Sequence, residues 1–112
     1  MVVVLFRSRL RARSGPDYAA TADRLVALAR AMSGFVSDRH YAADDGERVT
    51  LVELASDEAL RAWREHPEHR EGQRRGRGDW YAWYRLTTCA PLRDVEFSAE
   101  PRGLRRRDRR GW

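Results

Sequence analysis

Apolar positions along the chain follow two periods, and the order of these periods predicts the secondary structure. Residues 2–9 form a short β-branched, apolar run, which is typical of a strand covered on both faces. After a break at residues 14–17, apolar residues recur every three or four positions, which predicts an amphipathic helix ending at Ser33-Gly34. The apolar stripe of this helix consists of Tyr18, Ala22, Leu25, Ala29 and Met32.

The next two strands are predicted to form a hairpin. Residues 35–43 and 47–54 have strand character, and the Asp-Gly pair at Asp45-Gly46 between them is a strong signal for a tight turn. The two strands are therefore expected to pair antiparallel. Ser56 then provides an N-cap for a second helix, with acidic residues in the first turn where the helix dipole favours them.

The second helix is expected to break at His66-Pro67. Proline has no backbone N–H, so the carbonyl of Trp63, four residues earlier, loses its hydrogen-bond partner. The residue before a proline is also disfavoured in α geometry. A new helical turn is predicted to begin at the proline and to fade through Gly76 and Gly78.

Residues 80–88 predict a fourth strand, and residues 92–97 a short extension of it. The order of elements is then β-α-β-β-α-β. The standard solution for this order is an α+β domain in which a four-stranded antiparallel sheet has both helices on one face. We expect this domain to occupy residues 1–101, followed by an Arg-rich tail at residues 102–112.

The fourth strand is aromatic on both of its faces. Simple alternation puts Trp80, Ala82, Tyr84 and Leu86 toward the helices, and Tyr81, Trp83 and Cys89 on the other face. Because the helices cover only one face of the sheet, the other face needs a partner, and a second copy of the chain is the simplest one. We predict a homodimer that closes sheet to sheet, with Tyr81 and Trp83 in the interface.

The net charge of +5 belongs to the tail of this 112-residue chain. Residues 102–112 contain six Arg and one Asp, so the remaining acids and bases balance. A basic folded surface would indicate nucleic acid, whereas a neutral body does not, and we expect no nucleic-acid partner.

No apolar run approaches 18 residues, so no membrane span is predicted. The single cysteine, Cys89, excludes an internal disulfide and fits a reducing cytoplasm.

Candidate chemistry gathers around the predicted helix break, at Trp63, His66, His69 and Gln73. One interpretation is structural: the tryptophan packs in the core, the histidines cap the broken helix and the glutamine faces solvent. The other is functional: the break opens a gap between helix and sheet, and an aromatic wall and a titratable histidine face it. The sequence alone leaves both open.

A metal site is not expected. His66 and His69 form an H-x-x-H pair with no third ligand nearby, and His40 lies far along the chain on the second predicted strand. Gly76 and Gly78 do not match a phosphate-binding loop.

The segment from Gly34 to Tyr84 resembles proteins of the antibiotic biosynthesis monooxygenase family, in the dimeric α+β barrel superfamily. The resemblance covers roughly residues 2–97. The matching positions are Gly34-Phe35, Asp45-Gly46-Glu47, Glu53, Ala59, Trp63, His66-Pro67, His69, Gly76-Arg77 and Tyr84.

This resemblance implies a ferredoxin-like homodimer with a pocket between helices and sheet in each subunit. Characterised members include monooxygenases that oxidise phenolic polyketides with O2 and use no metal, flavin or heme, so no cofactor is expected. The resemblance implies catalytic roles for Trp63 and for His66 or His69 as the base. The residues expected to bind a small aromatic substrate are Phe6, Tyr41, Gln73, Trp80 and Tyr84.

Three alternatives come from the same superfamily. Heme-degrading relatives carry Asn and His where this chain has Phe6 and Gln73, so the iron ligand is missing. A non-oxidative polyketide cyclase would use the same histidine and cavity without O2. A small-molecule-binding accessory protein would show no turnover at all.

Overall fold

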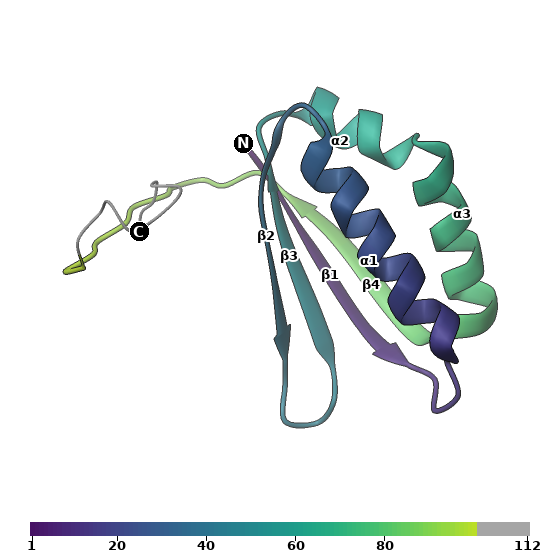
Figure 1. The fold of residues 1–112 in the computed structure, drawn as a ribbon. Helices are drawn as coiled ribbons and strands as arrows, with labels where there is room; N and C mark the ends of the chain where they lie inside the picture. Colours follow the sequence, from purple (N-terminus) through teal and green to yellow (C-terminus); the bar gives the residue numbers. More distant parts are fainter. Residues whose placement is uncertain (101–112) are drawn as a thin grey trace.

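A four-stranded antiparallel sheet in the order β2-β3-β1-β4 forms one layer of the molecule, and the helices form the other. The computed structural model describes residues 1–100, so the predicted tail at 102–112 lies outside the described residues. All helices lie on one face of the sheet (Figure 1), which confirms the α+β, ferredoxin-like prediction. The elements are β1 (Val2–Leu10), α1 (Pro16–Ala31), β2 (Phe35–Ala42), β3 (Arg48–Leu54), α2 (Asp57–Arg64), α3 (Pro67–Arg75), a π-helical turn η1 (Gly76–Trp80) and β4 (Tyr81–Cys89).

The helix break is confirmed. The Ser56 hydroxyl accepts a hydrogen bond from the backbone N–H of Ala59 at 3.1 Å and so caps α2. This helix ends at Arg64, and His66 is extended, with φ −64° and ψ 131°. Pro67 then occupies the first turn of α3, where its missing N–H costs nothing. Local backbone chemistry therefore divides this region into two helices.

The α-helix ends at Arg75, as predicted from Gly76 and Gly78, but the loss of helical coiling beyond it is not observed. The chain stays coiled as the π-helical turn η1, in which the backbone N–H of Tyr81 bonds the carbonyl of Gly76. A Cβ at Gly76 would lie 2.7 Å from Cε2 of Tyr81, so glycine here permits close approach of the tyrosine ring. The fourth strand consequently begins at Tyr81, one residue later than expected.

Tyr81 also lies on the face opposite to the predicted one. The register between β1 and β4 shifts, so that Arg9 pairs with Trp83 and Leu10 with Tyr81, leaving Ala82 as an extra residue. Such a β-bulge interrupts the two-residue alternation of a strand. As a result Tyr81 joins Tyr84 on the helix-facing side, and their ring centroids are 5.7 Å apart. Trp83 stays on the other, outer face.

The predicted strand extension at residues 92–97 is wrong. Only Val95 forms an isolated β-bridge, and the segment leaves the body of the domain as an extended arm (Figure 1). Leu92 and Phe97 are 101% and 79% exposed, because no sheet face lies beneath them.

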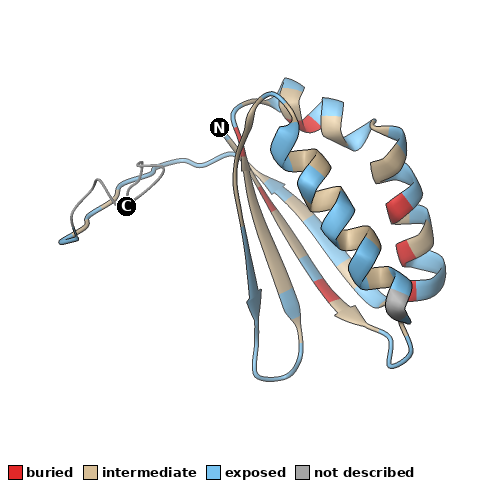
Figure 2. Cartoon of the chain, in the orientation of Figure 1, coloured by how far each residue is buried: buried red, intermediate tan, exposed pale blue. Residues whose placement is uncertain are grey.

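The interior is only partly filled. Val4, Leu54 and Leu60 form a buried cluster where α2 meets the ends of β1 and β3. Among residues 1–100 no side chain is less than 2% exposed, and Figure 2 shows buried residues only at scattered points. A domain of this size normally packs its core closely. The space between the sheet and α1 and α3 is therefore open.

Gly34 provides a test of the packing at the cluster end of the domain. Its φ is +89°, and a Cβ built there would lie 2.5 Å from Cβ of Ala59 in α2. We expect Gly34→Ala to lower the free energy of unfolding by about 3 kcal/mol, from a left-handed backbone and an overpacked contact together. The measurement is urea denaturation.

Gly15→Ala is the matched control for this variant. Its φ is +81°, but nothing lies within 4 Å of the added Cβ. It should lose only the backbone contribution, about 1–2 kcal/mol. Equal losses in the two variants would show that the approach to Ala59 does not limit the fold.

Candidate functional site

A cavity of about 990 Å³ lies between the helices and the inner face of the sheet. Residues from α1, α2, α3, η1 and all four strands border it. Trp63, His69, Phe6, Tyr41, Gln73, Trp80 and Tyr84 are all among the bordering residues, whereas His66 is not. The structure therefore places the predicted site residues around one hollow, with that one exception.

The break between α2 and α3 brings Trp63 and His69 together. Their ring centroids are 4.7 Å apart, at an interplanar angle of 50°. In an unbroken helix, residues six positions apart point about 120° away from each other. The extended conformation of His66 changes that direction, and both rings then border the cavity.

His69 has the electrostatic character of a neutral base. Burial lowers the pKa of its imidazole, a hydrogen bond to the backbone of Arg64 opposes this, and the nearby His66 lowers the pKa further. Within residues 1–100, Nδ1 of His69 is buried and has no hydrogen-bond partner. A neutral imidazole has one donor and one acceptor nitrogen, so a ring that donates to the Arg64 backbone keeps one lone pair to take a proton.

His66 has a structural role. Its Nδ1 accepts a hydrogen bond from the backbone N–H of Glu68 at 3.1 Å and so caps α3. Its ring centroid lies 5.7 Å from that of Trp63, and His66 is not among the residues that border the cavity. The structural interpretation of the two histidines therefore fits His66, which caps a helix. A functional role can still belong to His69, because His69 borders the cavity.

Substitution of His66 separates capping from chemistry. We expect His66→Ala to lower the free energy of unfolding by about 1 kcal/mol, because α3 loses its cap. His66→Asn should restore that stability, since asparagine is a strong N-cap residue, and should retain any activity of the protein. Thermal unfolding and turnover measured side by side test this. A His66→Asn variant that is stable but inactive would make His66 the base.

Aromatic rings form a second wall of the cavity. The Phe6 centroid lies 5.5 Å from that of Tyr81 and 5.4 Å from that of Tyr84. The Tyr84 hydroxyl accepts from Nη1 of Arg77 at 3.1 Å. Burial, with a hydrogen bond to Tyr18, raises the pKa of Tyr81, so its phenol stays protonated. This wall is apolar, with hydroxyl groups at its margin.

Tyr18 and Tyr81 were not predicted as site residues. Tyr18 begins the apolar stripe of α1, and its ring meets those of Trp80 and Tyr81 at 5.4 and 5.9 Å. A helical stripe residue is usually core, and nothing in the sequence of α1 distinguishes Tyr18 from the other stripe residues. Simple strand alternation predicted Tyr81 on the outer face, and the bulge in β4 instead turns it toward the helices.

The remaining predicted site residues differ in how they meet the cavity. Trp80 is only 3% exposed and is held in the wall, with the Arg75 guanidinium 4.8 Å from its ring centroid. Gln73 lies one helical turn after His69 on α3. Tyr41 borders the cavity but is 55% exposed, and Arg39 lies 6.0 Å from its ring. Tyr41 is therefore a rim residue rather than part of the wall.

Metal-ligating side chains do not gather in the described part of the chain. Within residues 1–100, no group of three or more His, Cys, Asp or Glu side chains is placed to hold a metal ion.

The helices of residues 1–100 do not have the length and apolar character of a membrane span.

Comparison with known proteins identifies relatives. The sequence profile of the family described as antibiotic biosynthesis monooxygenase matches residues 1–75. The uncharacterized protein YqjZ of Bacillus subtilis strain 168 is 33% identical over 81 residues, which are 72% of this chain and 70% of YqjZ.

Solved structures share the fold. Rv0793 from Mycobacterium tuberculosis superposes with a TM-score of 0.72 at 26% identity, covering 82% of this chain and 95% of that one. SnoaB from Streptomyces nogalater, a cofactor-independent oxygenase, superposes with a TM-score of 0.68 at 14% identity, covering 82% and 93%. At that low identity the second likeness concerns the fold alone.

Proposed function

The chain belongs to the antibiotic biosynthesis monooxygenase family, and we propose that it is a cofactor-independent monooxygenase that oxidises an electron-rich aromatic or polyketide-like molecule with O2. One observation carries this proposal. The imidazole of His69, whose buried Nδ1 has no hydrogen-bond partner, borders a hollow with aromatic walls. A buried polar atom without a partner is costly, and a catalytic role is one reason for a protein to keep one.

The size and the walls of the cavity support a flat aromatic substrate. Pockets for small molecules are typically about 300–1,000 Å³ and mostly apolar, with a few polar groups that set orientation. The cavity here, about 990 Å³, lies at the upper end of that range. Trp63 and the wall formed by Phe6, Tyr81 and Tyr84 offer ring faces to a fused-ring ligand. Gln73 offers an amide for orientation.

The chemistry requires a base, a confined space and O2. The neutral imidazole of His69 removes a proton from the reacting carbon and leaves an enolate-like anion. The anion passes one electron to O2, and the cavity holds the two radicals together until the carbon–oxygen bond forms. Loss of water from the resulting hydroperoxide turns a CH2 group into a carbonyl. One oxygen atom of O2 enters the quinone, and the other leaves in water.

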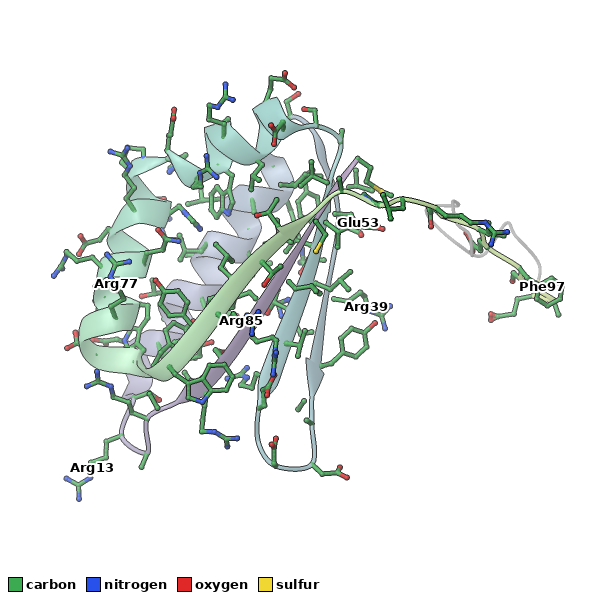
Figure 3. All side chains as sticks on the ribbon, turned by 180° about the vertical axis from the view of Figure 1, so that it is seen from behind. Arg13, Arg39, Glu53, Arg77, Arg85 and Phe97 are labelled. Carbon is green, nitrogen blue, oxygen red and sulfur yellow. The ribbon has the colours of Figure 1, made fainter. Side chains whose placement is uncertain are left out.

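We also propose that the protein acts as a homodimer. The outer face of the sheet, seen in Figure 3 with Arg39, Glu53 and Arg85 labelled, is not covered by any described element. Leu5 at its centre pairs with Leu51 of β3 and Thr87 of β4, and Trp83 on the same face is 38% exposed. A sheet face with a leucine pair at its centre and charged residues around it suits a second copy of itself.

The proposal is tested by turnover of an anthrone-type phenol by purified, metal-stripped protein. We expect O2 uptake that matches quinone formation and survives chelators. Quinone formation no faster than in the buffer blank would reject the monooxygenase. A product that forms equally well without O2 would instead indicate a cyclase, since the same base can serve non-oxidative chemistry. Tight binding with no product would indicate an accessory protein.

A further inference from the structure

A second histidine centre lies on the helix-facing side of β2 and β3. Nε2 of His40 is 2.9 Å from Oδ2 of Asp38, and Nδ1 of His40 is 3.0 Å from Oγ1 of Thr50. All three residues border the cavity. His40 and Thr50 face each other across the hairpin as a cross-strand pair. Neither the sequence motifs nor the family relationship assigns a role to this group.

The ionised carboxylate of Asp38 determines which group donates and which accepts in each of these hydrogen bonds. Arg30 donates to both carboxylate oxygens of Asp38, at 2.9 and 3.0 Å, and these bonds hold the pKa of that carboxyl below its usual range. An ionised carboxylate only accepts, so Nε2 of His40 carries the hydrogen. In the neutral ring Nδ1 is then the acceptor, and the Thr50 hydroxyl donates to it. The lone pairs of Thr50 Oγ1 remain available to a ligand.

The side chains of Asp38 and His40 differ in their exposure to solvent. The side chain of Asp38 is only 8% exposed, whereas that of His40 is 49% exposed. Figure 1 shows the hairpin ends of β2 and β3 extending beyond the helices. His40 therefore borders the cavity together with Thr50 and is also partly exposed to solvent. Asp38 with Arg30 holds the ring in place.

We propose that Thr50, His40 and Asp38 form a proton relay that takes a proton from a hydroxyl group of an aromatic ligand in the cavity and holds it on His40 beside the Asp38 carboxylate. This inference rests on the proposed function, because it assumes a phenolic ligand. The ligand hydroxyl gives its proton to Oγ1 of Thr50 as the Thr50 proton moves to Nδ1 of His40. The ligand becomes a phenolate and His40 an imidazolium beside the Asp38 carboxylate. No bond other than those to hydrogen changes, and no electron is transferred.

The relay and His69 act on different atoms of the same ligand. His69 lies on α3 and takes the proton at the reacting carbon, whereas Thr50 lies on β3 and takes one from a ring hydroxyl. A phenolate gives an electron to O2 more readily than the neutral phenol does. The relay would thus raise the electron supply for the step that the proposed function requires.

The test measures phenolate formation without O2. A hydroxylated anthrone is bound to saturation under anaerobic conditions, and its long-wavelength phenolate absorption is recorded. Wild-type protein should show the phenolate band. His40→Ala and Thr50→Val should lower the ratio of phenolate to phenol about tenfold or more, because an opposing charge next to a titrating group is worth one to three pKa units. Thr50→Ser, which keeps the hydroxyl, should retain the band.

Two further measurements distinguish proton transfer by His40 from a purely structural role of its side chain. Free imidazole should restore the band in His40→Ala, which a merely structural contact would not allow. Thr21→Val, a matched change in α1 outside the cavity lining, should leave the band unchanged. If His40→Ala does not fold, the Thr50→Val and Thr50→Ser pair decides the question with His40 intact.

The outcomes distinguish the relay from the oxygenase. An absent band in wild-type protein, an unchanged band in Thr50→Val, or a failure of imidazole to restore it would overturn the relay. Oxygen uptake that persists with an unchanged band in the relay variants would keep the oxygenase and reject the relay. A band that depends on Thr50 and His40 in a protein with no oxygen uptake would keep the relay and reject the oxygenase.

Discussion

Replacing His69 with glutamine is expected to lower kcat for quinone formation by about 10²–10⁴-fold, the usual contribution of a positioned general base. Glutamine can still donate to the backbone carbonyl of Arg64, so the junction of α2 and α3 should persist. It has no lone-pair nitrogen to take a proton. KM should change little, because the aromatic walls stay in place. Steady-state quinone formation and thermal unfolding, measured on the same preparations, test this.

His66→Asn is the matched control for the His69 variant. It changes a histidine three residues away that caps α3 and does not border the cavity. It should retain wild-type kcat. If instead His69→Gln turned over at the wild-type rate, the base would have to be sought elsewhere.

The pH dependence of kcat/KM is a second test of His69 as the base. Burial lowers the pKa of His69, so its neutral, active form should persist below the ordinary histidine value of about 6.5. The acid limb of kcat/KM should therefore lie below that pH, and an acid limb above it would contradict the assignment. Stability changes with the same sign. The unfolded chain takes up this proton first, so the contribution of His69 is present above about pH 6.5 and is lost as the pH falls.

Placing arginine at both Leu5 and Leu51 is expected to convert a dimer into a monomer. These leucines pair at the centre of the outer sheet face, where a sheet-to-sheet interface would bury them. Stable interfaces bury about 1,600 Å², and a buried unpaired charge at such a centre costs several kcal/mol. We expect the dissociation constant to rise by at least about a thousandfold, since each 1.4 kcal/mol is a factor of ten.

Sedimentation velocity over a range of concentrations measures this effect. Ala20→Arg adds the same charge on an exposed position of α1, away from the sheet, and should remain dimeric. A wild-type chain that sediments as a monomer, or a double variant that stays dimeric, would contradict the assignment of the outer face.

Local signals predicted most of the fold. The Asp-Gly turn fixed the hairpin of β2 and β3, and the structure has Gly46 at φ +92° there. Pro67 placed the division between α2 and α3, because the loss of an N–H acts on the backbone within four residues. The apolar stripe of α1 faces the sheet as predicted, and its members border the cavity.

Features set by contacts between distant segments could not be predicted in this way. The bulge that turns Tyr81 inward depends on how β4 pairs with Arg9 and Leu10 of β1. The π-helical turn depends on the Tyr81 ring lying against Gly76. In their local sequence, neither Tyr81 nor Gly76 differs from an ordinary strand or loop residue.

The candidate site shows the same division. His66 and His69 are three residues apart, and which of them borders the cavity depends on the direction in which α3 leaves the break. His40 was set aside as distant in sequence. The alternation of Asp38 and His40, with Thr50 opposite in the hairpin register, was the available signal for that group.

The most direct test of the central claim is a crystal structure of the protein with a hydroxylated anthrone bound under anaerobic conditions. The ligand should occupy the hollow beside Trp63, with its reacting carbon about 3–3.5 Å from a ring nitrogen of His69, as a near-attack geometry requires. A hollow filled by the protein's own side chains, or a ligand bound outside it, would contradict the account.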